Sequence, residues 1–72
     1  MMFGNLRAEM SRNKLTGTDM ADVLHISHQS FYKKMSGETD FTLRQMMMIQ
    51  LHLQTVNPAE KEHYTLDYLF TP

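Results

Sequence analysis

Apolar residues recur every three or four positions along most of this chain, which is the pattern of amphipathic helices. The pattern predicts five helices and no strand: residues 3–13, 17–25, 28–35 and 43–53, and a short last helix that holds Leu66, Leu69 and Phe70. Three of these helices follow a serine or threonine, whose hydroxyl can accept a hydrogen bond from a free N–H group of the first turn. These expected cap residues are Thr16, Ser27 and Thr42.

The apolar positions that share a face in each helix are expected to meet in one core. At about 100° per residue, the fourth helix places four residues on its core side: Leu43, Met46, Ile49 and Leu53. The rest of the chain adds Leu6, Met10, Leu15, Ala21, Leu24, Ile26, Phe31, Leu69 and Phe70. The sequence therefore predicts an all-α protein.

The fourth helix carries a second apolar stripe, formed by Met47, Met48 and Leu51, on nearly the opposite side. A surface helix normally has polar residues there. Either residues 54–64 fold over this stripe, or the stripe is an interface with another chain, a second copy or a different partner.

Length and composition narrow the range of functions. A chain of 72 residues without cysteine fits one domain, residues 1–72, that is stabilised by packing alone. Its longest apolar run is four residues, too short for a membrane span, and no signal peptide is visible. We expect a cytoplasmic binding module rather than an enzyme, with no catalytic residue, cofactor, small-molecule substrate or metal, since the four histidines are scattered.

Residues 16–36 have the outline of a helix-turn-helix. Ala21 is small where two helices would cross, Ile26 is apolar inside the turn, and Phe31 would hold the second of the two helices against the core. A generic small helical bundle needs the same apolar positions, so the pattern alone leaves both open.

Several strings resemble the Cro and phage-repressor helix-turn-helix family. The main one is Leu15-Thr16-Gly17-Thr18-Asp19-Met20-Ala21-Asp22-Val23-Leu24-His25-Ile26-Ser27, and Asn5-Leu6-Arg7-Ala8-Glu9-Met10, Ser36-Gly37-Glu38-Thr39 and Leu66-Asp67-Tyr68-Leu69-Phe70 agree with it. The resemblance implies a small five-helix fold of the lambda-repressor type. Overall length and pattern also look like the modulator-of-repression (antirepressor) proteins that temperate phages of Gram-positive bacteria encode beside their repressor.

In this family the start of the third helix enters the major groove of DNA. By position, the resemblance assigns that role to Ser27, His28, Gln29, Tyr32 and Lys33. Gln29 could read adenine, Lys33 could reach guanine or phosphate, and His28 and Tyr32 could donate to phosphates. Each of them could equally belong to an ordinary solvated helix face.

Three departures from the family pattern weaken the interpretation that this chain binds DNA. Gly17 stands where the family often has a polar residue, and His25 stands where it often has glycine. The loop after the third helix, usually basic, holds Glu38 and Asp40. The chain has seven basic residues and a net charge of −1, whereas a specific DNA-binding protein often makes about 6–10 phosphate contacts.

Two functions remain in competition, and both belong to the phage switch between lysis and lysogeny. In the first, the chain modulates transcription by docking on a partner repressor and altering or blocking its DNA binding, with acidic residues facing the repressor's basic surface. Those residues would be Asp19, Asp22, Glu38 and Asp40. In the second, it is a Cro-like regulator that binds operator DNA as a dimer through its third helix. A toxin-neutralising or other interaction module on the same fold is a third reading.

Overall fold

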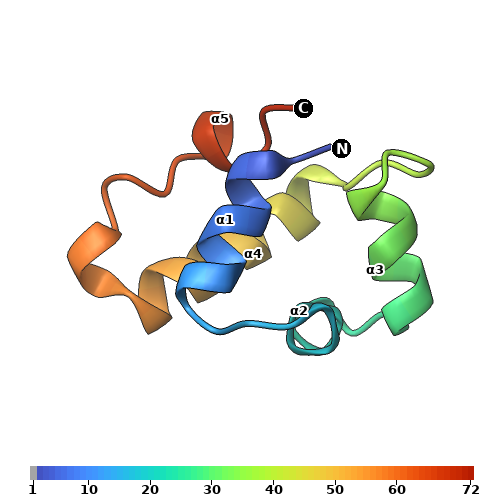
Figure 1. Ribbon diagram of the computed structural model, residues 1–72, viewed down its shortest axis with the longest axis horizontal. Helices are drawn as coiled ribbons and strands as arrows, with labels where there is room; N and C mark the ends of the chain where they lie inside the picture. The colour runs from blue at the N-terminus through green and yellow to red at the C-terminus, as the bar shows by residue number, and fades with distance from the viewer. Residues whose placement is uncertain (1) are drawn as a thin grey trace.

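The computed structural model describes residues 2–72, and within that range the chain is helical without any strand. Five α-helices and one short 3-10 helix follow one another around a small core (Figure 1). They are α1 (Gly4–Arg12), α2 (Gly17–Leu24), α3 (His28–Met35), α4 (Leu43–Val56), η1 (Pro58–Glu60) and α5 (Leu66–Leu69). The predicted all-helical class and the five helices are confirmed.

Hydroxyl caps begin four of the helices. Thr16, Ser27 and Thr42 each accept a hydrogen bond from the backbone N–H three residues later, as predicted, and Thr65 caps α5 in the same way. At α2 and α4 the cap is reciprocal, because Asp19 and Gln45 accept from the backbone N–H of the cap residue. Because of these caps, the starts of α2, α3 and α4 agree with the prediction.

Three helices have bounds that differ from the prediction, and the smallest difference is in α2, which ends at Leu24 with His25 as its cap. Phe3 and Asn13 flank α1 rather than belong to it, since Phe3 has left-handed backbone angles and Asn13 is the C-terminal cap. The fourth helix continues past Leu53 to Val56, where Asn57 and the following proline end it.

The core contains most of the predicted residues together with several others. Its buried apolar side chains are Leu6, Met10, Met20, Ala21, Leu24, Phe31, Met35, Phe41, Ile49, Leu53, Tyr64 and Leu69. Four predicted members, Leu15, Ile26, Met46 and Phe70, are half-buried and pack against this cluster, and so does Met48 of the second apolar stripe. Edge-to-face contacts of Phe3 with Phe41 and Phe70, at 5.5 and 5.8 Å between ring centroids, bring the two ends of the chain together.

Leu43 is a wrong core prediction, because 61% of its surface is exposed. Ile49 and Leu53 are fully buried, so they define the core side of α4. At about 100° per residue, Leu43 is turned roughly 80° away from Leu53. Phe41, just before the helix, fills that end of the core instead and is only 8% exposed.

The connection between α2 and α3 is a tight turn. His25 adopts the left-handed conformation, with φ 57° and ψ 40°, that glycine would take more easily. Its N–H donates to the carbonyl of Asp22, and the N–H of Ile26 donates to the carbonyl of Ala21 at 3.0 Å. The turn therefore satisfies the carbonyls of Ala21 and Asp22 near the end of α2. The chain changes direction there before α3 begins.

Candidate functional site

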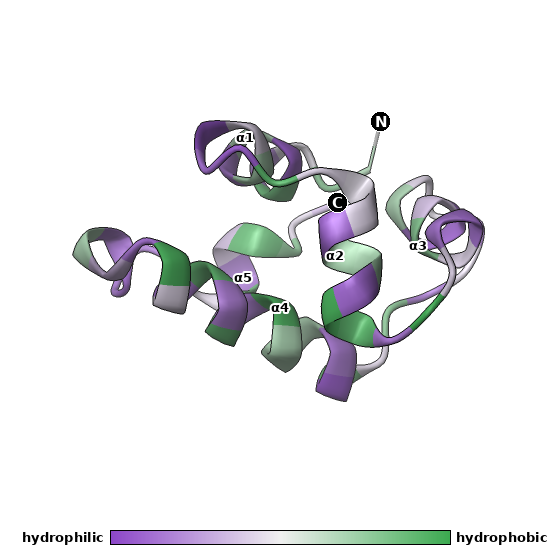
Figure 2. Cartoon of the chain, turned by 90° about the horizontal axis from the view of Figure 1, so that it is seen from below, coloured by the Kyte–Doolittle hydropathy of each residue, from purple (hydrophilic) through white to green (hydrophobic). Residues whose placement is uncertain are grey.

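The outer face of α4 is apolar and uncovered. Met47 is 53% exposed and Leu51 is 65% exposed, and Leu43 continues the same row toward the start of the helix. These three residues form what we call the α4 strip. With Arg44, Met48, Gln50 and Gln54 they line a shallow groove of about 540 Å³. Figure 2 shows green, hydrophobic bands on α4 that alternate with purple, hydrophilic ones.

Residues 54–64 do not cover the α4 strip, so the first of the two alternatives for the second apolar stripe is wrong. This segment turns back through η1 and places Tyr64 in the core. The side-chain amides of Gln50 and Gln54 donate to the carbonyl of Tyr64, at 3.0 and 3.5 Å, and hold the segment beside α4 rather than across its outer face. Only Met48 of the predicted stripe is half-buried.

The residues of the third helix to which the family resemblance assigns contact with DNA lie together on one exposed face. The Ser27 hydroxyl is used as the N-terminal cap of α3. His28 and Tyr32 pack edge to face, with ring centroids 4.5 Å apart. Gln29 and Lys33 are exposed and line a hollow of about 380 Å³ together with Arg7, Tyr32, Ser36 and Glu38.

Gly17 explains part of this arrangement. A Cβ atom at Gly17 would lie 3.1 Å from the Cζ and hydroxyl atoms of Tyr32 and 3.2 Å from Nε2 of His28. The two aromatic side chains of α3 therefore cover the start of α2 at close range. A larger residue at position 17 would displace them.

The four acidic residues do not form one cluster. Asp19 and Asp22 lie on α2, which precedes α3, whereas Glu38 and Asp40 follow the end of α3. Asp19 is also engaged locally: the backbone N–H and then the hydroxyl of Thr16 donate to it, and they hold the pKa of its carboxyl below the ordinary value. The four acidic residues are all exposed, and they belong to two separate segments of the chain.

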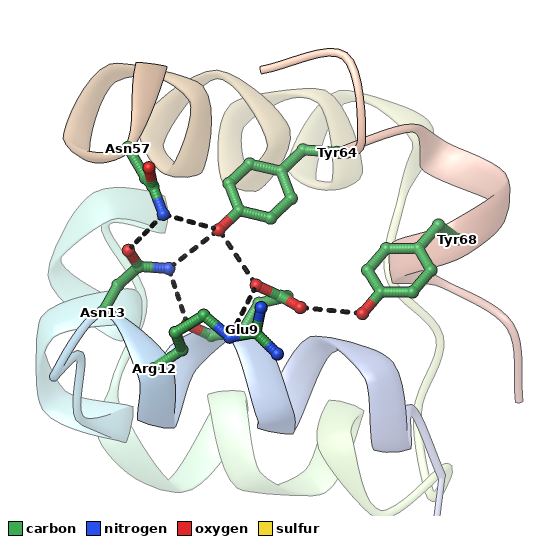
Figure 3. A network of polar contacts seen from close by, with 6 residues as sticks. All are labelled: Glu9, Arg12, Asn13, Asn57, Tyr64 and Tyr68. Carbon is green, nitrogen blue, oxygen red and sulfur yellow. Dashed lines mark hydrogen bonds and ion pairs between the residues drawn. The ribbon is translucent and has the colours of Figure 1, made fainter. Parts of the chain in front are cut away.

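A polar network that the sequence did not reveal lies between α1 and the C-terminal segment (Figure 3). Glu9 is completely buried, and its carboxylate accepts hydrogen bonds from the hydroxyls of Tyr64 at 2.9 Å and Tyr68 at 2.7 Å. The Tyr64 hydroxyl in turn accepts from the side-chain amides of Asn13 and Asn57. We call these residues, with Arg12, whose Nε lies 3.6 Å from the Glu9 carboxylate, the Glu9 network.

This network keeps Glu9 ionised. Burial alone would raise the pKa of Glu9. The hydrogen bonds from Tyr68 and Tyr64, with the charges of Arg12 and His63, outweigh burial, and the pKa of Glu9 lies below its ordinary value of 4.5. The same bond to Glu9, together with burial, raises the pKa of Tyr68 above 10.0. Every polar atom of the carboxylate is used inside the protein, so the network is structural.

Arg7 lies on another side of α1 and, unlike Glu9, has a shielded polar atom without a hydrogen bond within the described part of the chain. Its Nε atom is shielded from solvent and has no hydrogen-bond partner among residues 2–72. A shielded N–H group without an acceptor is energetically unfavourable and is rare in folded proteins. Arg7 lines the hollow on α3 and also a cleft of about 280 Å³ between α1 and α3.

Across residues 2–72, no three histidine, aspartate or glutamate side chains lie close enough together to hold a metal ion. Over the same residues, no helix has both the length and the apolar character that crossing a bilayer requires.

Comparison with models of protein families, with curated proteins and with solved structures found no match to this chain. Its function has to be argued from the surfaces described above.

Proposed function

We propose that this chain is a transcriptional modulator of a temperate-phage lysis–lysogeny switch, with a helix-turn-helix fold, that binds a partner repressor and alters or blocks its binding to DNA. The α4 strip is the observation that carries the proposal. An uncovered apolar surface rimmed by polar groups is typical of a surface that contacts another protein. Nucleic acid offers no comparable apolar surface, because phosphates and sugars make most of its contacts.

The connection of α2 and α3 supports the helix-turn-helix part of the proposal. Two helices of eight residues are joined by a turn with a left-handed residue, His25, and Ile26 inside that turn packs against the core. The family resemblance of residues 15–27 agrees with this arrangement.

Electrostatics favour a protein partner over DNA. The chain carries a net charge of −1, and two acidic residues, Glu38 and Asp40, follow α3 directly. Affinity for DNA rises with the number of phosphates that basic side chains neutralise, whereas acidic residues speed association with a basic protein surface. The acidic pair at the end of α3 is the one we assign to the partner's basic DNA-reading surface.

The test combines size-exclusion chromatography with the repressor encoded next to this protein and a gel-shift assay with the intergenic DNA. We expect a complex with the repressor and loss of the repressor's DNA shift. The double variant Met47→Glu and Leu51→Glu should lose the complex while circular dichroism stays unchanged. The double variant Ala8→Glu and Ala59→Glu adds the same charge at two exposed positions outside the groove and is the matched control. A complex that forms unchanged with the double variant contradicts the role of the α4 strip.

The second candidate is a Cro-like regulator that binds operator DNA as a dimer. The specific observation in its favour is that Gln29, Tyr32 and Lys33 are exposed on one face of α3, with Arg7 beside them. A helix presented in this way could read base edges in the major groove.

One pair of substitutions separates the two candidates. Glu38→Lys with Asp40→Lys changes the net charge from −1 to +3, two units for each substitution. It should weaken a complex with a basic repressor and strengthen any binding to DNA. If the wild-type protein alone shifts operator DNA at nanomolar concentration in physiological salt, the second candidate is right.

A further inference from the structure

The cleft beside Arg7 is a second site with chemistry of its own. It lies between α1, the start of α2 and α3, and has a volume of about 280 Å³. Its apolar wall comes from Met10, Leu15, Phe31 and Met35, and its polar groups come from Arg7, Ser11 and Tyr32. Drug-sized ligands occupy about 300–1,000 Å³, so this cleft suits a single side chain.

Arg7 supplies the only full charge among the residues that line this cleft. Its Nε is out of contact with water and has no acceptor among residues 2–72. The ion pair on α1 joins Arg12 to Glu9 and does not involve Arg7. A guanidinium group presents its N–H groups in a planar fork that matches a carboxylate or a phosphate. The terminal N–H groups of this guanidinium are not shielded in the way Nε is, so an anion bound in the cleft would meet those groups and neutralise the charge beside the shielded Nε.

We infer that this cleft binds an acidic side chain of the protein partner, with the carboxylate on Arg7 and the methylene groups on the apolar wall. The inference rests on the proposed function for the identity of the occupant, but the chemistry of the cleft belongs to this chain alone. Glutamate fits best, because it combines an aliphatic stem with a carboxylate at its end.

Two features favour a carboxylate over a nucleic-acid phosphate. A phosphodiester has no apolar stem to cover Met10, Phe31 and Met35, which line the cleft. Glu38 lines the neighbouring hollow that Arg7 and Tyr32 share, and its negative charge opposes the approach of a polyanion more strongly than that of one carboxylate.

The first experiment uses the isolated protein and small anions, followed by NMR at the Nε–Hε signal of Arg7 and at the methyl groups of Met10 and Met35. Butyrate, which has the shape of a glutamate side chain, should give a saturable shift of these signals. Acetate, butyramide and inorganic phosphate should bind at least about tenfold more weakly, since they lack either the stem or the carboxylate.

Variants make the assignment specific. Arg7→Met keeps the apolar stem and removes the charge, and it should abolish the saturable methyl shifts with butyrate. Lys61→Met removes one positive charge from an exposed position outside the cleft and should leave them unchanged. Shifts that grow without saturation, or that persist in Arg7→Met, overturn the site. Stronger binding of phosphate than of butyrate, or of a short DNA duplex at Arg7, overturns the carboxylate assignment in favour of nucleic acid.

The second experiment tests the occupant in the repressor complex. Arg7→Met should weaken that complex by about tenfold or more, because a charge-assisted hydrogen bond is lost. If the wild type binds the repressor and Arg7→Met binds it equally well, the inference about the occupant fails and the proposed function stands. If the wild type does not bind the repressor, the proposed function fails, and the carboxylate site is then judged by the butyrate titration alone.

Discussion

Glu9 and Arg7 lie two residues apart on α1 and face different parts of the molecule. Glu9 is fully buried, and both oxygens of its carboxylate accept hydrogen bonds from tyrosine hydroxyls. Arg7 is half-buried, and its shielded Nε has no partner among residues 2–72. On one side of α1, the described residues supply the hydrogen bonds of the buried carboxylate. On the other side, a shielded N–H group has no hydrogen-bond acceptor among them.

This difference separates groups that serve the fold from groups available for binding. Removing a partner from a satisfied buried group leaves unpaired atoms behind and is costly, whereas removing a group that has no partner costs little. The two sides of α1 should therefore respond to substitution in opposite ways. The following predictions test that contrast, from the largest expected effect to the smallest.

Glu9→Ala should lower the free energy of unfolding by about 3 kcal/mol, because the hydroxyls of Tyr64 and Tyr68 lose a charged acceptor inside the protein. Urea unfolding followed by circular dichroism measures the change. Glu62→Ala, at an exposed position, is the matched control and should stay within about 0.5 kcal/mol of the wild type. A loss below about 1 kcal/mol for Glu9→Ala would remove the contrast between the two sides.

The Glu9 network should also make stability depend on pH. The folded protein holds the pKa of Glu9 below 4.5, so the unfolded chain binds a proton more readily. The stabilisation is complete above pH 4.5 and is lost as the pH falls through the lowered pKa of the folded state. Urea titrations at several acidic pH values should show this slope in the wild type and a shallower one in Glu9→Gln. Equal slopes would mean that other carboxyl groups, such as Asp19 with its own lowered pKa, carry the dependence.

Arg7→Met should leave the free energy of unfolding within about 0.5 kcal/mol of the wild type or raise it slightly, since a shielded N–H group without an acceptor is replaced by an apolar side chain of similar length. Thermal and urea unfolding measure the change. A destabilisation above about 1.5 kcal/mol would show that Arg7 supports the fold, and the two sides of α1 would then be alike.

Gly17→Ala should have the smallest effect on stability, within about 0.5 kcal/mol. The added Cβ would meet Tyr32 at 3.1 Å and His28 at 3.2 Å, and the contacted atoms are the outer ends of exposed side chains that can move. Aromatic NMR signals of both residues should shift while the backbone signals of the core do not. Because Tyr32 lines the cleft beside Arg7, the affinity for butyrate should also change in this variant.

Local features of the fold could be predicted from the sequence, because they depend on neighbouring residues. The hydroxyl caps at Thr16, Ser27 and Thr42 follow from residue type and position, and the helical period identified Ile49 and Leu53 as core. Leu43 was misplaced, since at about 100° per residue it lies roughly 80° around the helix from buried Leu53 and in the same row as exposed Met47 and Leu51.

The Glu9 network and the Arg7 cleft could not be predicted in the same way. Glu9 lies three residues after buried Leu6, so its position on the inner face of α1 was a signal, yet its partner Tyr64 is 55 residues away. One sequence does not say which distant hydroxyl will meet a carboxylate. Arg7 has the ordinary appearance of a solvated charge in the sequence, and only the folded structure shows that its Nε is shielded.

The distance along the chain between Glu9 and its partners has a consequence for synthesis on the ribosome. At about 5–20 residues per second, the 55 residues that separate Glu9 from Tyr64 take roughly 3–11 s to add. Until then the Glu9 carboxylate has neither of its tyrosine partners, so its burial is not compensated by the hydrogen bonds that it makes in the folded protein. The Glu9 network is therefore complete only after the C-terminal segment that carries Tyr64 and Tyr68 has been translated.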